Sequence, residues 1–240
     1  MKTSIIILTC NNFMYSKMCI DSIRKYTRKN DYEIIVVDNN SQDGTKSWLR
    51  KQKDIKTIYN KVNEGFPKGC NVGIKKASGS EILLLNNDVI VTSNWLLNLK
   101  KCLYSDNKIG AVGPVTNTCY GKQKIFVKYN SLYEMQRFAK KYNVSNSNRW
   151  VKTRGLVGFC ILIKMKVINN LGYLDERFTP GNFEDDDYCL RMVRKGYKLM
   201  ICKDTFVHHY GSISFKNTEY SKIINANRIK FERKWGMKLQ

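Results

Sequence analysis

Short apolar runs alternate with amphipathic segments through roughly the first hundred residues of the chain. Apolar runs at residues 4–8, 33–37, 56–59 and 82–86 predict buried strands. Helical spacing of apolar positions predicts helices at residues 16–26, 41–51, 69–77 and 93–103, the last with Ser93 as its N-cap. Strands and helices that alternate in this way are typical of βαβ units. We therefore expect an α/β domain with a mostly parallel, Rossmann-like sheet and helices on both faces.

Polar residues follow three of these predicted strands at the point where each strand ends. Asn11 and Asp38 follow the first two, and Asp88 interrupts the run ILLLNNDVIV. Ligands of open α/β sheets bind at this edge, so we expect a shared pocket there. The chain has neither a G-x-x-x-x-G-K-[ST] phosphate loop nor a G-x-G-x-x-G turn after its first strand. Turns and close helix packing explain the glycines of segment 65–73 better than a dinucleotide site does.

Length, composition and cysteine usage bound the class of protein. With 240 residues, of which 42% are hydrophobic, the chain suits one large domain or a domain with a small appendage. The apolar run at residues 5–8 is too short for a signal peptide or a membrane span, and we interpret the chain as cytoplasmic. The eight cysteines form no C-x-x-C pair and lie mostly in apolar runs, which favours reduced, packed thiols.

The charge of the chain is strongly positive and uneven. Lys and Arg number 42 against 20 Asp and Glu, a net charge of +22, and residues 120–170 contain eleven basic residues against one acid, Glu134. Such a field favours anionic partners, although solubility is an equally good explanation. We expect no nucleic-acid partner, because the chain shows no recognition helix or stacking motif and carries a concentrated acidic cluster. That cluster comprises Asp175, Glu176, Glu184, Asp185, Asp186 and Asp187.

Seven ordered segments carry a family resemblance. They are SIIILTCNN, EIIVVDNNSQDGT, NEGFPKGCNVGI, LLLNNDVIV, GFCILIKMKVI, NFEDDDYCLRMVRKGY and FVHHYGS. In this order they resemble the motifs of glycosyltransferase family 2, the inverting nucleotide-sugar transferases of GT-A fold. The resemblance spans residues 4–215. It implies a GT-A domain at residues 1–215, with a nucleotide-binding half at 1–115 and an acceptor half at 116–215.

The resemblance implies transfer of a hexosyl or N-acetylhexosaminyl group from a nucleotide-diphosphate sugar, with a UDP-sugar expected first. The acceptor would be a hydroxyl of a glycan, a lipid-linked glycan or a protein in cell-surface glycan synthesis. A non-catalytic sugar- or nucleotide-binding module of the same fold is the alternative. Asp38, Asp88 and Asp185 argue against it, because a site that only binds has no chemical need of three carboxylates.

The resemblance also implies which residues bind the nucleotide and the donor sugar. Asp38 is expected to hydrogen-bond the nucleobase or ribose, and an Asx turn with Asn39 and Ser41 is the alternative. The expected nucleotide and donor set is Thr9, Asn11, Asp38, Asn39, Ser41, Asn63, Gly65, Phe66, Asn71, Asn87, Asp88, Gly158 and Phe159.

A divalent cation, Mn²⁺ or Mg²⁺, is expected to neutralise the leaving diphosphate, with Asp88 as one ligand. In the family this position ends an acidic D-x-D signature, whose first two residues are Asn86 and Asn87 here. A neutral amide oxygen compensates less charge than a carboxylate, so tight metal binding is in question. A role for Asp88 as a cap of the next turn is the alternative.

The only two histidines, His208 and His209, are adjacent on a predicted late strand. The resemblance places a metal contact here, and spacing to the Gly-Ser pair at 211–212 favours His208, with His209 as the fallback. Alternation along a strand would point one of the two toward the site and the other away. A packed histidine without a metal is the alternative.

The segment NFEDDDYCLR resembles the family's acidic motif at the start of a helix beneath the acceptor site. Glu184 and Asp185 match its central pair, and the resemblance assigns Asp185 as the base for the acceptor hydroxyl. Crowded carboxylates repel, which raises the pKa of one member toward a value useful for proton transfer. The alternative is a helix N-terminus that favours acids, with Asp187 and Arg191 as an i, i+4 pair.

Residues 216–240 predict a basic amphipathic helix. Its inward face comprises Tyr220, Ile223, Ile224, Asn227, Phe231 and Trp235. We expect this helix to dock on the core; resting on an anionic membrane and leading into further segments are the alternatives. The basic segment 137–154 adds the hypothesis of a lipid-diphosphate acceptor, with peripheral contact at the inner face of the membrane.

Overall fold

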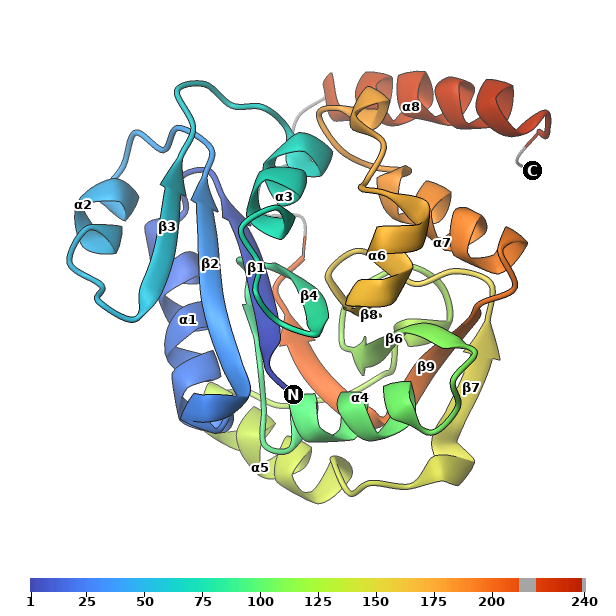
Figure 1. The fold of residues 1–240 in the computed structure, drawn as a ribbon. Coiled ribbons are helices and arrows are strands. Elements are labelled where there is room, and N and C mark those ends of the chain that lie inside the picture. Colours follow the sequence, from blue (N-terminus) through green and yellow to red (C-terminus); the bar gives the residue numbers. More distant parts are fainter. Residues whose placement is uncertain (212–218, 239–240) are drawn as a thin grey trace.

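The computed structural model describes residues 1–211 and 219–238 (Figure 1). These residues form a sheet of nine strands in the order β3-β2-β1-β4-β8-β6-β9-β5, with β7 paired to β9. The strands are β1 (Thr3–Thr9), β2 (Tyr32–Asp38), β3 (Ile55–Tyr59), β4 (Glu81–Asn86), β5 (Val89–Ile90), β6 (Ile109–Thr116), β7 (Trp150–Thr153), β8 (Cys160–Lys164) and β9 (Lys198–His209).

Helices cover this sheet. The α-helices are α1 (Phe13–Tyr26), α2 (Thr45–Leu49), α3 (Phe66–Ile74), α4 (Trp95–Tyr104), α5 (Leu132–Tyr142), α6 (Met165–Leu171), α7 (Glu184–Arg194) and α8 (Glu219–Trp235). Short 3₁₀ helices are η1 (Lys29–Asp31), η2 (Gly121–Gln123), η3 (Ser147–Arg149) and η4 (Glu176–Phe178).

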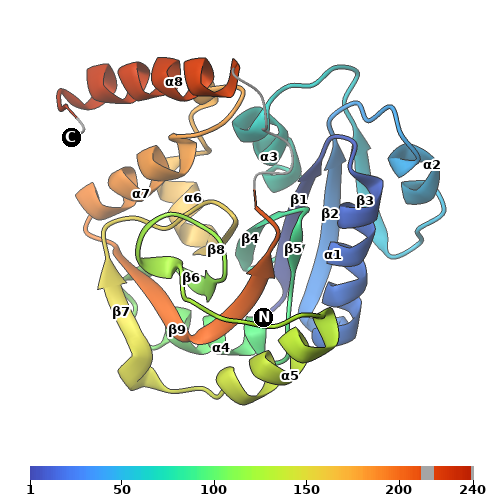
Figure 2. The ribbon, with the colours of Figure 1, turned by 180° about the vertical axis from the view of Figure 1, so that it is seen from behind.

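The N-terminal half of the sheet is parallel, as predicted: β3, β2, β1 and β4 all run in the same direction. Successive aliphatic residues point to opposite faces, so Ile5 and Ile7 join the core under α1 and α4, whereas Ile6 joins the core under α3. Helices lie on both sides of the sheet in Figures 1 and 2. Burial on both faces explains why these strands are continuous apolar runs.

The C-terminal half of the sheet mixes directions. β8 runs antiparallel to both β4 and β6, and β9 is parallel to β6. β7 and β5 pair antiparallel with opposite ends of β9, a strand of 12 residues. The last residue of β9, His209, is aligned with Val89 of β5. The end of the last strand therefore lies beside the turn that follows β4.

Several helix boundaries differ from the sequence prediction. The helix expected at 41–51 is confined to α2, because Asp43 accepts hydrogen bonds from the N–H and the hydroxyl of Thr45 and closes a turn before it. Ser93 does not cap α4. Asn94, at φ 60°, precedes that helix, and the Ser93 hydroxyl is buried without a hydrogen-bond partner among the described residues. α3 begins at Phe66, with proline in its first turn.

α3 packs very closely on β1. A Cβ atom at Gly69 would collide with the side chain of Leu8, and one at Gly73 would collide with Ile6. Close helix packing therefore accounts for these glycines. All eight cysteines lie in the described residues as free thiols, six of them buried, in agreement with the sequence prediction.

α8 lies across η4 and the start of α7 (Figure 1). Phe231 is buried, with ring centroids 6.4 Å from Phe178 and 5.7 Å from Phe183. Asn227 Nδ2 donates to the carbonyl of Phe178 at 2.7 Å. The helix thus docks on the core through its amphipathic face, while the side chain of Tyr220 lies outside the described residues. Among the described helices, none is both long and apolar enough to cross a membrane.

Candidate active site

A cavity of about 660 Å³ opens where β4 and β9 end. Its walls include Asn86 at the end of β4, Phe159 just before β8, Asp185 in the first turn of α7 and His209 at the end of β9. These residues come from four separate segments of the chain. The cavity lies at the carboxyl ends of strands, where the architecture predicted a ligand site.

Asp38 ends β2 and is fully buried. Its Oδ2 accepts a hydrogen bond from the N–H of Ser41 at 3.2 Å, so the Asx-type turn does form. Its Oδ1 is buried with no hydrogen-bond partner in the described residues, which suits a donor group of a ligand or a water. Ser41 Oγ accepts from the N–H of Asn11 at 2.7 Å, and the N–H of Asn39 donates to the Thr9 carbonyl at 2.7 Å. The expected nucleotide residues at these two strand ends therefore form one connected unit.

The segment 63–66 borders this unit. Asn39 Nδ2 donates to Asn63 Oδ1 at 3.0 Å and to the carbonyl of Gly65 at 3.1 Å. Gly65 has φ 77°, a conformation that favours glycine, and Phe66 lines the cavity. Four residues expected to bind the nucleotide or donor are thereby brought together: Asn39, Asn63, Gly65 and Phe66.

Asn71 lies elsewhere. Its Nδ2 donates to the carbonyl of Leu174 and to Glu176 Oε1, both at 2.9 Å, and its Oδ1 accepts from the N–H of Leu174 at 3.0 Å. The buried amide holds α3 to the segment before η4 and does not line the cavity. Asn71 therefore has a structural role.

The two residues after β4 point in different directions. Asn87 Nδ2 donates to Ser16 Oγ at 2.9 Å and to Thr9 Oγ1 at 3.3 Å, which anchors the turn to α1 and β1. Asp88 is nearly buried, and its Oδ1 lies 3.2 Å from His209 Nε2. The apolar run stops here because the chain must turn before β5 pairs with β9, and the turn sets a carboxylate beside the cavity.

The two histidines face opposite sides of β9, as alternation predicted. His209 stacks on Phe159, with ring centroids 5.2 Å apart, and its Nδ1–H donates to the Thr118 carbonyl at 2.8 Å. His208 points the other way, where its Nδ1 lies 2.6 Å from the Tyr129 hydroxyl, and burial lowers its pKa to about 4. The structure therefore brings His209, the fallback, to Asp88. Ser212, half of the pair that favoured His208, lies outside the described residues.

The Nε2 atom of His209 is well suited to a metal ion. Because Nδ1 donates to a carbonyl, the neutral ring carries its lone pair on Nε2. That nitrogen is buried 3.2 Å from Asp88 Oδ1; burial lowers the pKa of His209, and the neighbouring Asp88 carboxylate outweighs this and raises it. Within residues 1–211 and 219–238, no three Cys, His, Asp or Glu residues gather as a metal site. The chain thus offers a pair of ligands, one oxygen and one nitrogen, that fits a borderline or hard divalent cation.

Asp185 and Glu184 begin α7 and differ in environment. Asp185 Oδ2 accepts a hydrogen bond from the N–H of Gly158 at 2.7 Å, and Oδ1 accepts one from the N–H of Asp186 at 2.9 Å. Burial raises the pKa of Asp185, and these hydrogen bonds oppose the rise. Burial, followed by the charge of Asp185, raises the pKa of Glu184 well above its ordinary value, and its Oε2 has no partner among the described residues. Asp185 is therefore the better placed of the two to carry the negative charge.

The alternative reading of the acidic cluster holds for one member. Asp187 is fully buried and accepts from Arg191 Nε at 2.9 Å, the i, i+4 pair expected from the sequence. It also accepts a hydrogen bond from Trp235 Nε1 at 3.0 Å and pairs with Lys234 Nζ at 2.5 Å. Asp187 thus fastens α8 to α7 and takes no part in the cavity.

Sequence reasoning missed one wall of the cavity, the segment that includes Cys119, Tyr120 and Lys124. This stretch follows β6 without periodic patterning, so nothing in the sequence marked it. Gln123 within it is buried, and its Oε1 accepts from the N–H of Val157 at 2.8 Å. That bond fixes the backbone just before Gly158.

The chain matches the model of glycosyl transferase family 2 over residues 4–172. It belongs to this family. Among curated proteins it is similar to glycosyltransferase AglE of Haloferax volcanii, with 25% identity over 211 residues that cover 86% of this chain and 66% of the relative. The chain spans two thirds or less of the length of the first curated relatives that it matches.

Two solved structures illustrate the fold. The mannosyltransferase PcManGT from Pyrobaculum calidifontis, in complex with GDP-Man and Mn²⁺, aligns with a TM-score of 0.70 at 19% identity, over 97% of this chain and 64% of that chain. S. aureus TarS 1-349 in complex with UDP-GlcNAc aligns with a TM-score of 0.62 at 17% identity, over 97% and 67%. The chain therefore has the GT-A fold.

Proposed function

We propose that this protein transfers a sugar from a nucleotide-diphosphate sugar, with a UDP-sugar first in order, to an acceptor hydroxyl with inversion at the anomeric carbon. The observation that carries the proposal is that Asp185 and His209, the latter in contact with Asp88, line one cavity at the strand ends. A base and a metal ligand that line the same cavity are what a single displacement requires. Family membership supports the reaction class.

Asp88 Oδ1 and His209 Nε2 would hold the cation, Mn²⁺ or Mg²⁺, which supplies charge neutralisation for the leaving diphosphate. This revises the expected partner from His208 to His209, on the grounds that only His209 approaches Asp88. The neighbour PcManGT was solved with Mn²⁺, which supports the choice of ion. Asn86 lines the cavity and would add only a neutral oxygen, which compensates less of the cation's charge than a carboxylate does.

Asp185 acts as the general base. As the acceptor oxygen attacks the anomeric carbon, its proton passes to Asp185, and the bond from that carbon to the diphosphate oxygen breaks. One sugar bond forms as the other is lost, so no covalent enzyme intermediate arises and the configuration inverts. The two backbone N–H groups on Asp185 hold the carboxylate in place while leaving further lone pairs for the proton.

The strand-end unit around Asp38 would bind the nucleoside. The buried Oδ1 of Asp38, which has no partner among the described residues, would accept from a nucleobase N–H or a ribose hydroxyl, and segment 63–66 would close the slot. TarS was solved with UDP-GlcNAc and PcManGT with GDP-Man, so both bases are candidates, with uridine first.

The test is thermal unfolding of the chain with nucleoside diphosphates and nucleotide sugars, with and without Mn²⁺, on the native sequence and on Asp88→Asn. Stabilisation of about 2.7 kcal/mol is expected at a hundredfold excess over Kd, and it should need both Mn²⁺ and Asp88. With the donor identified, NMR of the product gives its anomeric configuration. Retention would refute the displacement. Nucleotide binding without transfer to any acceptor would favour a non-catalytic binding module.

A further inference from the structure

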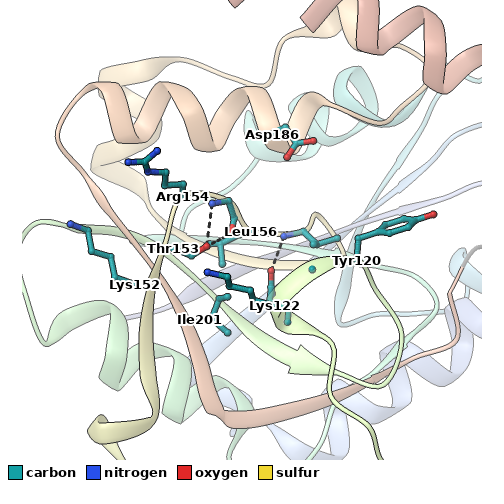
Figure 3. A pocket seen from close by; sticks show the side chains of 12 residues that line it. Tyr120, Lys122, Lys152, Thr153, Arg154, Leu156, Asp186 and Ile201 are labelled. Carbon is teal, nitrogen blue, oxygen red and sulfur yellow. Dashed lines mark hydrogen bonds between the residues drawn. The ribbon is translucent and has the colours of Figure 1, made fainter. Parts of the chain in front are cut away.

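A second cavity, also of about 660 Å³, adjoins the first beneath α7 (Figure 3). Tyr120, Val157 and Asp186 line both cavities, so one extended molecule can occupy the two together. The remaining walls come from η2, from β7, from the turn that leads out of β7 and from Ile201 of β9. None of these elements belongs to the strand-end unit around Asp38 or to segment 63–66, where we propose that the nucleoside binds.

Three basic side chains line this second cavity: Lys122 of η2, Lys152 of β7 and Arg154 just after β7. In Figure 3, Lys152 and Arg154 lie toward one end of the pocket and Asp186 toward the other, with Lys122 between them. Asp186 is the only acid in the lining. Within residues 1–211 and 219–238, none of the three cations forms an ion pair or a hydrogen bond through its side chain.

Lys122, Lys152 and Arg154 are exposed to solvent where they line this hollow, and a cleft lined by charges of one sign attracts ions of the opposite sign. Arginine binds phosphate through its planar fork of N–H donors, and lysine binds it as a point charge. The volume of the cavity falls in the range of small-molecule sites and far exceeds one phosphate, so there is room for the sugar or polyol that carries it. Tyr120 is 84% exposed at the shared wall and offers a ring face to such a chain.

We propose that this cavity binds a phosphate-bearing acceptor, with the phosphate on Lys122, Lys152 and Arg154 and the reacting hydroxyl directed past Asp186 to Asp185. This inference rests on the proposed function, because the acid end of the cavity matters only if a hydroxyl is to be deprotonated there. The phosphate serves to position the acceptor and keeps all its bonds during the transfer. A neutral acceptor would supply no negative charge to pair with these three cations.

The test compares two double variants that remove the same charge. Lys122→Ala with Arg154→Ala empties the cavity of two cations, while Lys51→Ala with Lys53→Ala removes two exposed lysines between α2 and β3. The probe is sn-glycerol 3-phosphate, and glycerol is the uncharged control. Isothermal titration calorimetry measures the affinity of each compound for each protein. We expect binding to be about tenfold weaker in the cavity variant and nearly unchanged in the control, since each lost contact removes a close charge. Glycerol should not bind at either variant or at the native protein.

A second arm separates the sources of phosphate. Phosphatidylcholine vesicles with and without phosphatidic acid are tested on the same variants. Cavity-dependent binding of glycerol phosphate supports a soluble or polymer-borne acceptor, and cavity-dependent binding of the phosphatidic acid vesicles alone supports a lipid-borne one. Equal weakening in both double variants, or no binding of either probe, overturns the proposal, because the general positive field would then explain everything.

Thermal stabilisation by UDP and Mn²⁺ is measured on both double variants as well. It should be equal in the two, because the cavity cations lie outside the strand-end unit around Asp38. If no nucleoside diphosphate or nucleotide sugar stabilises the native protein in the presence of Mn²⁺, the proposed function is refuted by itself. Normal stabilisation with no discrimination between the double variants would refute only the acceptor site.

Discussion

The carboxylate of Asp185 is held by the backbone of Gly158, whose N–H donates to Oδ2 at 2.7 Å. A Cβ atom at residue 158 would lie 3.2 Å from that oxygen, closer than side chains normally allow. Gly158→Ala should therefore displace the proposed base by a few tenths of an ångström. Because transfer depends on alignment of the base, we expect kcat to fall about 10- to 100-fold. Steady-state kinetics with the identified donor give the value.

Gly44→Ala is the matched control for this change. A Cβ there would come no closer than 3.9 Å to Phe13, and the backbone of Gly44 is in the right-handed region. Its kcat should equal that of the native protein. Nucleotide-induced stabilisation should be intact in both variants, because neither change touches Asp38. Normal kcat in Gly158→Ala would show that Asp185 is not the group that needs this alignment.

The adjacent histidines form a natural pair of variants. His209→Ala removes the nitrogen that lies 3.2 Å from Asp88, whereas His208→Ala removes a ring packed on Tyr129 and Tyr210. We expect the apparent affinity for Mn²⁺, read from the stabilisation in the presence of UDP, to be at least tenfold lower in His209→Ala. In His208→Ala the Mn²⁺-dependent stabilisation should persist. Titration of Mn²⁺ against thermal stability measures this. The opposite order would restore His208 as the metal contact.

The histidine assignment shows where sequence reasoning ends. Alternation along a strand predicted that one ring faces the site, yet the choice depends on register, and β9 shows a register irregularity opposite Pro114 and Val115. Local spacing could not reveal that irregularity. Only the pairing of β5 with β9, which aligns His209 with Val89, decides the face.

The parallel half of the sheet was predictable because its signals are local. Apolar runs and helical periodicity fixed β1, β2 and β4, and the polar residues after them marked the ligand edge. The second cavity was not predictable, because an irregular segment after β6 forms one of its walls together with residues of β7 and α7. Loops of this kind have no periodicity, and their contacts are set by tertiary packing. Charge counting found an excess of cations in residues 120–170 but could not show that Lys122 and Arg154 share a cavity.

Glu184 should make the stability of the protein depend on pH. Burial raises its pKa in the folded state, so the folded protein holds a proton that the unfolded chain has released. Stability contributed by this group is then full below the unfolded pKa of about 4.3 and is lost as the pH rises toward the folded value. Glu184→Gln cannot titrate and escapes this loss. We expect Glu184→Gln to gain stability over the native protein at about pH 8 and to gain little at about pH 4.

Urea unfolding at the two pH values measures the difference. The comparison within each pH cancels the titration of groups far from residue 184, whereas the neighbouring Asp185 and Asp186 titrate together with Glu184 and belong to the measured effect. A gain of equal size at both pH values would contradict a proton-binding Glu184. A loss at high pH would mean that the carboxylate is ionised and paired in the folded protein.

Asn227 of α8 holds the loop that leads into α7. Its Nδ2 donates to the carbonyls of Phe178 and Gly181 at 2.7 and 2.8 Å, and the side chain is 1% exposed. Asn227→Ala leaves these carbonyls without their donor, which costs about 1–3 kcal/mol of unfolding free energy. This loop leads directly into the first turn of α7, which carries Asp185, so its displacement should misplace the proposed base. We therefore also expect kcat to fall while the stabilisation by nucleotide and Mn²⁺ persists. Asn225→Ala, on the exposed face of the same helix, is the control and should change neither quantity. If Asn227→Ala lowers stability but leaves kcat unchanged, α8 supports the fold without positioning the base.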